Sequence, residues 1–338
     1  MNVLSLFDGI SCGLVALDRS GFVVDNYYAS EIDNYAIKIS QKNHPSIKRV
    51  GDVTKLRIPK GFKIDLLLGG SPCQGFSFAG KQLNFDDPRS KLFFEYARIL
   101  KECRRYNPDV LFLLENVSMK KEFQDVISSV LGVEPIAINS ALVSAQSRKR
   151  LYWTNITEIT QPGDKGIFLK DILQDESEVD LSYRVNEERA FIMLDKEVEK
   201  GKIGYFGVDS QANRVYSIHG KSVTLCGEAG GGAAKMGQYL FGCITPDRLN
   251  KRQNGQRFNE GEKFYTLTAQ DLHGILKDGY IRKLTPIECE RLQTLPDGYT
   301  DGISNSQRYK CLGNGWTVDV ISFILSHIKQ PIEIPYPS

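Results

Sequence analysis

Cys73 and Glu115 are the residues of this sequence best suited to chemistry, and each lies just beyond a short apolar run. Cys73 stands in the turn Gly-Gly-Ser-Pro-Cys-Gln-Gly (69–75), after Ile64–Leu68, and Glu115 follows Val110–Leu114. A thiolate is a strong nucleophile near neutral pH, and a carboxyl group after an apolar run is costly to bury unless it is paired or used. A thiolate beside a carboxyl group that protonates a ring nitrogen suits addition to an electron-poor pyrimidine. A buried, inert thiol is the commoner fate of a cysteine, but the flanking Ser-Pro and Gln-Gly argue against simple packing.

A second group of residues suggests a site for a nucleoside. The turn Phe7–Gly13 follows an apolar strand and opens a helix, so its glycines allow close approach of a ligand. Glu31 ends the second predicted strand, where an acid suits a ribose diol, and Asp52 is placed to accept from an exocyclic amine. Taken singly, Phe7 is equally compatible with a core aromatic, and Glu31 with an acid at a helix N-terminus. Together these residues outline an adenosine pocket.

The elements that must position these residues alternate between strand and helix. Strands are expected at 3–7, 27–30, 64–68 and 110–114, and helices at 14–19, 35–42, 90–105 and 120–131. Strands separated by helices of this length imply a parallel sheet covered on both faces, with its strand ends at one edge. Residues 161–200 are charged and mostly helical in pattern, and 201–280 are glycine-rich with short β-like pieces. A final apolar helix is expected at 315–329.

Composition narrows the class of protein. The 338 residues carry a net charge of +2, which neither indicates nor excludes a nucleic-acid partner. The seven cysteines are scattered and form no Cys-x-x-Cys pair, so neither a disulfide framework nor a metal site is expected. We expect no membrane span and no signal peptide, and therefore a cytoplasmic protein.

The ordered motifs closely resemble the DNA cytosine-5 methyltransferases of bacterial and phage type, with some likeness to the animal de novo enzymes in Gly-Trp-Thr-Val (315–318). Gln-Ser-Arg-Lys-Arg (146–150) and residues 282–293 and 309–315 match further family motifs. The resemblance implies the cofactor S-adenosyl-L-methionine, with S-adenosyl-L-homocysteine as product. The cofactor-binding residues that it implies are Phe7, Asp8, Gly9, Gly13, Glu31, Ile32, Asp52, Val53, Pro72, Leu92 and Asn314.

The same resemblance implies the catalytic residues Cys73, Glu115, Arg148 and Arg150. Cys73 would add to C6 of a cytosine flipped out of duplex DNA, and Glu115 would protonate N3. Arg148 would contact the base edge, and Arg150 would hold the catalytic loop or the cysteine. Candidate DNA contacts are Gln74, Ser77, Arg248, Arg252 and Arg257. The three arginines lie in a basic, amide-rich stretch that also has the composition of an ordinary polar loop.

The expected fold class is α/β: a Rossmann-like methyltransferase domain with a mixed, mainly parallel sheet, and a smaller, irregular, β-rich target-recognition domain. The catalytic domain is expected at 1–160 plus 281–338, and the recognition domain at 161–280. The expected role is restriction-modification or protective phage methylation, carried out by a monomer in the cytoplasm of a bacterial or phage-infected cell. A cognate restriction endonuclease is a possible partner, but it need not bind the methyltransferase. Two alternatives stay open: methylation of tRNA cytosine, although the Cys-Phe-Thr signature of those relatives is missing, and a catalytically inactive DNA-binding homologue. A nicotinamide dehydrogenase is disfavoured by the glycine spacing.

Overall fold

The computed structural model describes residues 1–71, 91–183, 191–198, 202–206, 214–218, 220–222, 224–225, 238–240 and 281–329. By its contacts the chain divides into two compact units. The first contains Met1–Ser140, Lys149–Gly163 and Gly315–Ser338, and the second contains Ala141–Arg148 and Asp164–Asn314. These units group 281–314 with the middle of the chain, whereas the sequence assigned that stretch to the catalytic domain. The functional division into a catalytic and a recognition domain stays a prediction.

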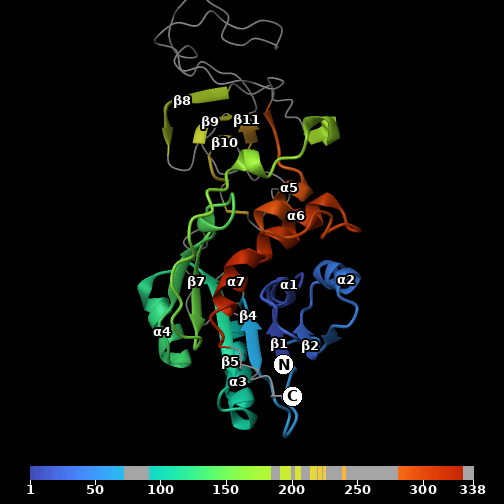
Figure 1. Ribbon diagram of the computed structural model, residues 1–338, viewed down its shortest axis with the longest axis vertical. Coiled ribbons are helices and arrows are strands. Elements are labelled where there is room, and N and C mark those ends of the chain that lie inside the picture. The colour runs from blue at the N-terminus through green and yellow to red at the C-terminus, as the bar shows by residue number, and fades with distance from the viewer. Residues whose placement is uncertain are drawn as a thin grey trace, which may run out of the picture. The chain divides into compact units, whose positions relative to one another are not determined.

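The first unit is built on a seven-stranded sheet of order β3-β2-β1-β4-β5-β7-β6 (Figure 1). Its strands are β1 (Asn2–Leu6), β2 (Asn26–Ser30), β3 (Lys48–Arg49), β4 (Leu66–Gly69), β5 (Leu111–Val117), β6 (Ile136–Asn139) and β7 (Lys149–Thr154). β7 pairs antiparallel with β5 and with β6, and the remaining neighbours pair in parallel. The predicted mixed, mainly parallel sheet is therefore confirmed.

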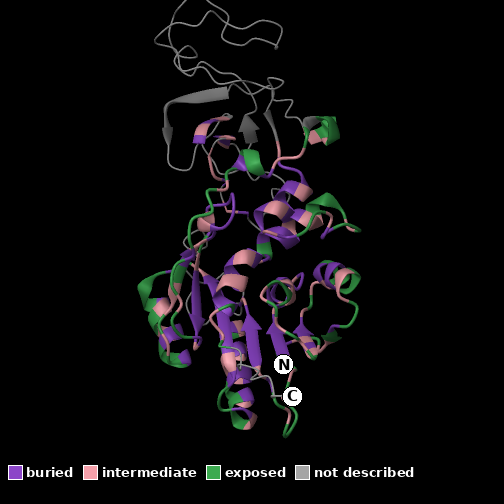
Figure 2. Cartoon of the chain, in the orientation of Figure 1, coloured by how far each residue is buried: buried purple, intermediate pink, exposed green. Residues whose placement is uncertain are grey.

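Helices cover this sheet because its strands are apolar on both faces, as Figure 2 shows for the buried strands. The helices of the unit are α1 (Cys12–Arg19), α2 (Asn34–Asn43), α3 (Lys91–Tyr106), α4 (Lys121–Leu131) and α7 (Val318–Leu325). Buried side chains of α3 and α4 form one core cluster with Leu4, Leu6 and Phe112. α1 packs against α7, which is shorter than the predicted helix 315–329.

The start of α2 fixes the chain just after β2. Asp33 caps the helix, because its Oδ1 accepts from the backbone amides of Tyr35 at 2.9 Å and Ala36 at 3.4 Å. Glu31 and Ile32 therefore occupy a two-residue link between a paired strand and a capped helix. Such a link has little freedom, which suits residues that must hold a ligand.

The second unit contains a five-stranded sheet of order β12-β11-β10-β9-β8. Its strands are β8 (Phe191–Val198), β9 (Lys202–Phe206), β10 (Arg214–Ser217), β11 (Gln238–Leu240) and β12 (Ile281–Arg282), and its helices are α5 (Pro286–Leu292) and α6 (Asn305–Asn314). α5 begins with a capping box between Thr285 and Glu288. The β-rich character of this part of the chain is confirmed.

The helical pattern expected for 161–200 is wrong. The described part of that stretch contains short 3-10 turns at Leu169–Asp171, Glu176–Glu178 and Leu181–Tyr183, followed by strand β8. Charged residues at helical spacing do not by themselves form a helix, since a stable helix also needs an apolar face packed on a core. Within the described part of the chain, no helix is both long and apolar enough to cross a membrane.

Candidate active site

The strand register of the first unit brings three predicted site residues and Gly70 to one edge of the sheet. Leu6 of β1 is level with Ser30 of β2 and with Gly69 of β4, and Gly69 is level with Leu114 of β5. The next residues of the four strands are Phe7, Glu31, Gly70 and Glu115. Because these strands are parallel, their following residues lie in a row at the carboxyl edge, where α/β folds bind ligands.

The loop after β1 has an unusual backbone. Phe7, Gly9 and Ser11 all have positive φ, at 56°, 56° and 63°. At Gly9, a Cβ atom would meet no heavy atom of the described residues within 4 Å. Positive φ in a phenylalanine and a serine is strained, and such strain is often held at functional sites.

Glu31 fixes this loop to the link after β2. Its Oε2 accepts from the amide of Gly9 at 2.8 Å, and its Oε1 accepts from the amides of Ile32 at 2.7 Å and Asp33 at 2.8 Å. A carboxylate has about four acceptor positions, so three amide donors leave one for a hydroxyl group. Glu31 therefore holds the loop and still has capacity for a ribose hydroxyl.

Asp8 supports the loop from inside the protein. Its side chain is fully buried and accepts from Ser11 Oγ at 2.5 Å and from the Tyr27 hydroxyl at 2.8 Å. Burial raises the pKa of this carboxyl group, and the hydrogen bonds from Ser11 and Tyr27 oppose that rise. The Asp8 side chain thus supports the loop from the core, and the predicted contact of Asp8 with the cofactor stays a prediction.

Ile32 and Asp52 expose the groups that a nucleoside base would need. Ile32 is 74% exposed, so its apolar side chain is accessible to a ligand. Asp52 Oδ1 accepts from the Thr54 amide and hydroxyl, both at 2.9 Å, and these bonds lower the pKa of the Asp52 carboxyl group. An exposed apolar face and an ionised acceptor fit the ring and the amine of adenine.

The other described cofactor candidates of the first unit pack in or against the core. Val53 is 5% exposed and lies in the core cluster, and the partly buried Leu92 packs against that cluster from α3. Gly13 of α1 lies against the core, since a Cβ there would come within 2.8 Å of Leu68 Cδ1. Asn314 ends α6 in the second unit and is exposed.

Glu115 lies inside β5, one residue beyond Leu114, where the sequence was expected to end the strand. β7 pairs alongside as far as Val117, and this pairing extends β5 through the acid. The Arg150 Nε atom of β7 lies 3.0 Å from Glu115 Oε1, and both side chains are largely buried, at 13% and 12% exposure. The guanidinium charge of Arg150 therefore lies directly beside the Glu115 carboxylate.

Gly70 and Trp316 close the other side of Glu115. A Cβ atom on Gly70 would lie 2.8 Å from Trp316 Nε1 and 3.2 Å from Glu115 Oε2. Glycine is therefore required by close approach, and Trp316, which the sequence analysis did not propose as a site residue, becomes part of the site. Its place in the Gly-Trp-Thr-Val motif was the available signal.

Asn116 anchors the chain that leads to Cys73. Its Nδ2 atom donates to Ser71 Oγ at 3.2 Å and to the Ser71 carbonyl at 3.4 Å, and its own Oδ1 accepts from the Val117 amide at 2.8 Å. Cys73 follows Ser71 by two residues in the sequence. Neighbouring residues of one strand thus hold the acid and the start of the loop that carries the thiol.

The two predicted arginines have different partners. Arg148, in the second unit, is 5% exposed and donates from Nη1 to the Leu225 carbonyl at 2.8 Å and from Nη2 to the Gly313 carbonyl at 3.1 Å. Arg150, in the first unit, is the arginine beside Glu115. The contact of Arg148 with a base edge stays a prediction, but its guanidinium group already holds the carbonyls of Leu225 and of Gly313 in α6.

The remaining predicted site residues lie outside the described part of the chain: Pro72, Cys73, Gln74, Ser77, Arg248, Arg252 and Arg257. Their roles stay predictions. Among the described residues, no three histidine, cysteine, aspartate or glutamate side chains gather in a way that could hold a metal ion.

A family model and the similar proteins of known name agree on one family for this chain. Residues 1–330 match the family model described as C-5 cytosine-specific DNA methylase. The chain is 30% identical to the orphan methyltransferase M.SPRI of Bacillus phage SPR, over 97% of this chain and 97% of the relative. It is 28% identical to the type II methyltransferase M.HhaI of Haemophilus parahaemolyticus, over 99% of this chain and 97% of the relative.

Solved structures agree on the fold. The Entamoeba histolytica methyltransferase EhMeth has a TM-score of 0.66 at 17% identity, covering 97% of each chain. A mutant of Spodoptera frugiperda DNMT2 has a TM-score of 0.63 at 21% identity, covering 96% of this chain and 98% of the other. At these identities the likeness concerns the fold alone.

Proposed function

This chain belongs to the family of C-5 cytosine-specific DNA methylases, and from that premise we propose that it methylates C5 of a cytosine flipped out of a specific short sequence in duplex DNA. The observation that carries the proposal is the row at the carboxyl edge of the sheet. Glu115 lies there between Arg150 and Gly70, and Phe7 and Glu31 follow the strands on the same edge. An acid and a nucleoside pocket on one rigid edge are what a methyl transfer to a base requires.

The proposed holder of S-adenosylmethionine is the pocket of Phe7, Gly9, Glu31, Ile32 and Asp52. Glu31 has one acceptor position left for a ribose hydroxyl, Asp52 suits the adenine amine, and Ile32 offers an apolar face. When bound there, this cofactor supplies an electrophilic methyl group. These donor and acceptor types fit the adenosyl part of the molecule.

The protein's own residues would prepare the cytosine. The target base must leave the helix, because its reactive carbons are inaccessible in a stacked duplex. The Cys73 thiolate forms a bond to C6, while Glu115 transfers a proton to N3, and C5 becomes nucleophilic enough to accept the methyl group. A base then removes the C5 proton, the electrons of that C–H bond restore the C5–C6 double bond as the bond from C6 to the Cys73 sulfur breaks, and N3 returns its proton to Glu115. Arg150 would keep the Glu115 carboxyl group directed at N3.

We further propose duplex DNA as the substrate of a monomer, and restriction-modification or protective phage methylation in the cytoplasm as the role. Two phage and bacterial relatives are named as an orphan and a type II methyltransferase, which supports this role. Gln74, Ser77, Arg248, Arg252 and Arg257 remain the candidate DNA contacts. A cognate endonuclease is not needed for the reaction.

The first test is analysis of the product. Incubation with duplex DNA and S-adenosylmethionine should give 5-methyl-2′-deoxycytidine, identified by mass spectrometry of the hydrolysed nucleosides. Parallel incubations with tRNA should give no 5-methylcytidine. Methylation at N4, methylation of tRNA alone, or DNA binding without any methylated product would contradict the proposal and favour a different enzyme or an inactive homologue.

Gly70→Ala should strongly impair the reaction. The new Cβ would lie 2.8 Å from Trp316 Nε1 and 3.2 Å from Glu115 Oε2, so one of these groups must move. We expect kcat to fall about 10²-fold, the order of loss that accompanies a misplacement of about 1 Å. The unfolding free energy should fall by about 1–3 kcal/mol, as for an overpacked core.

The control for this variant is Gly163→Ala, because a Cβ at Gly163 would meet no heavy atom within 4 Å. Adding Trp316→Leu to Gly70→Ala should restore part of the rate, since it removes the indole ring from the contact. An unchanged kcat in a folded Gly70→Ala protein would show that Glu115 does not depend on this contact.

A further inference from the structure

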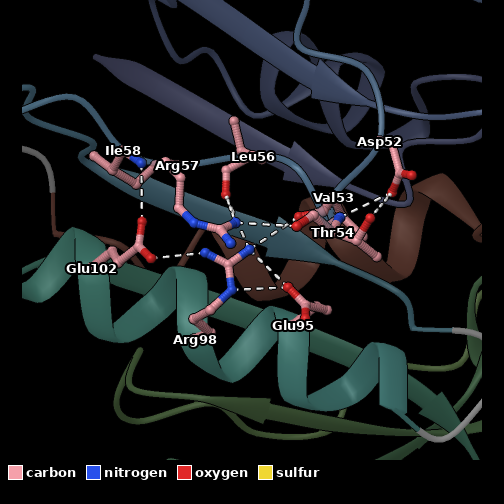
Figure 3. A network of polar contacts seen from close by, with 9 residues as sticks. All are labelled: Asp52, Val53, Thr54, Leu56, Arg57, Ile58, Glu95, Arg98 and Glu102. Atoms are coloured by element: carbon pink, nitrogen blue, oxygen red, sulfur yellow. Dashed lines mark hydrogen bonds and ion pairs between the residues drawn. The ribbon is translucent and has the colours of Figure 1, made fainter.

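Arg98 of α3 lies at the centre of a polar network that reaches residues 52–58 (Figure 3). Its Nη2 atom donates to the Val53 carbonyl at 3.1 Å and to the Leu56 carbonyl at 3.0 Å. Both carbonyls belong to the stretch that directly follows Asp52. One guanidinium nitrogen therefore ties this stretch to a helix of the core.

Two glutamates of the same helix hold Arg98 in place. Arg98 Nε donates to Glu95 Oε2 at 2.8 Å, and Nη1 donates to Glu102 Oε1 at 2.7 Å. The second oxygen of Glu102 accepts from the Ile58 amide at 3.0 Å. Arg98 and Glu102 thus bind three backbone groups of 53–58, and all of these groups lie in the first unit.

Asp52 has no comparable anchor of its own. Asp52 is partly buried, and among the described residues its carboxylate accepts hydrogen bonds from Thr54, two residues further on. The turn itself is closed by the Lys55 amide on the Asp52 carbonyl at 3.0 Å and the Leu56 amide on the Val53 carbonyl at 3.2 Å. The direction of the Asp52 carboxylate therefore follows the position of the turn that Arg98 holds.

We propose that Arg98 is a positioning residue that sets the enzyme's preference for the exocyclic amine of adenine, by holding the turn that presents Asp52. This inference rests on the proposed function, because it assumes that Asp52 accepts from that amine. Arginine suits the task, since its planar fork donates to carbonyl and carboxylate oxygens in several fixed directions at once. Lysine has a single charged nitrogen and cannot reproduce these hydrogen bonds to two carbonyls and two carboxylates.

The test compares the binding of two ligands to each variant by calorimetry, without any turnover. S-adenosylhomocysteine carries the 6-amino group, and S-inosylhomocysteine carries a carbonyl oxygen there, which cannot donate to Asp52. The ratio of the two affinities is unaffected by the folded fraction of a variant, because both ligands bind the same folded molecules. The wild-type protein should prefer the adenosyl ligand about tenfold to hundredfold, the worth of a hydrogen bond to a charged group.

Arg98→Met should reduce this preference to less than about threefold, close to that of Asp52→Asn. The double variant should lose no further preference, because both changes act on one contact. Arg98→Lys should keep an intermediate preference. Arg105→Met is the matched control, since Arg105 is an exposed residue of the same helix, and it should keep the full wild-type ratio.

Two results would overturn the inference, and they differ. If Arg98→Met weakens the binding of both ligands equally, the ratio of the two affinities stays at its wild-type value. Arg98 is then merely structural, and the proposed function stands. If the wild-type protein does not bind S-adenosylhomocysteine at all, the proposed function fails and the inference fails with it.

Discussion

Cys73→Ala is expected to abolish methyl transfer while the protein still binds DNA and S-adenosylhomocysteine. The thiolate is the proposed nucleophile, and without its bond to C6 the C5 carbon is not activated. Loss of a covalent nucleophile costs on the order of 10⁶-fold in kcat in a well-studied protease, so activity should fall below detection. Single-turnover assays with labelled S-adenosylmethionine measure the rate, and gel-shift titration measures DNA binding.

Cys103→Ala is the control for this variant. The cysteines of the described chain, Cys12, Cys103, Cys289 and Cys311, are all buried. Burial raises the pKa of the Cys103 thiol to about 12, so it stays protonated and is a poor nucleophile. Cys103→Ala should lower stability and keep methyl transfer at temperatures where it is folded. Measurable turnover by Cys73→Ala would exclude Cys73 as the nucleophile.

Glu115→Gln is expected to lower kcat by about 10²–10⁴-fold, the usual worth of a positioned general acid. Glutamine has nearly the same shape as glutamate, but it cannot transfer a proton to N3. Binding of DNA and of S-adenosylhomocysteine should change little, because the substitution leaves the strand pairing of β5 with β7 in place. Rapid-quench measurement of the first turnover separates this chemical step from product release.

Glu122→Gln of α4 is the matched control, because its side chain is 65% exposed and its 3.8 Å ion pair with Lys120 is at the surface. It should keep the wild-type rate. If Glu115→Gln also keeps that rate, protonation of N3 by Glu115 is not part of the mechanism, and another donor must be sought.

The sequence predicts the sheet edge well, because local patterns determine it. Apolar runs of four or five residues followed by glycine or acid locate the ends of β1, β2 and β4 within one or two residues. The parallel register then aligns Phe7, Glu31 and Glu115 without any further information. Motifs at strand ends are therefore the part of this site that a sequence can show.

Contacts between segments that are distant in the chain could not be predicted from the sequence. The burial of Asp8 depends on Tyr27, which lies on another strand, and no local pattern indicates that this carboxyl group faces inward. Arg148 and Arg150 are two residues apart, and only the pairing of β7 with β5 shows which one meets Glu115. Arg98 looks like an ordinary charged residue of a helix until its two backbone partners are known.

The measurement that tests the central claim most directly is bisulfite sequencing of DNA from a host that expresses this chain. A C5 methyltransferase with a defined target should leave cytosines unconverted at one recurring short sequence, and expression of Cys73→Ala should leave none protected. Complete conversion in cells that contain the folded wild-type protein would contradict the claim, as would the same protected sites in cells expressing Cys73→Ala.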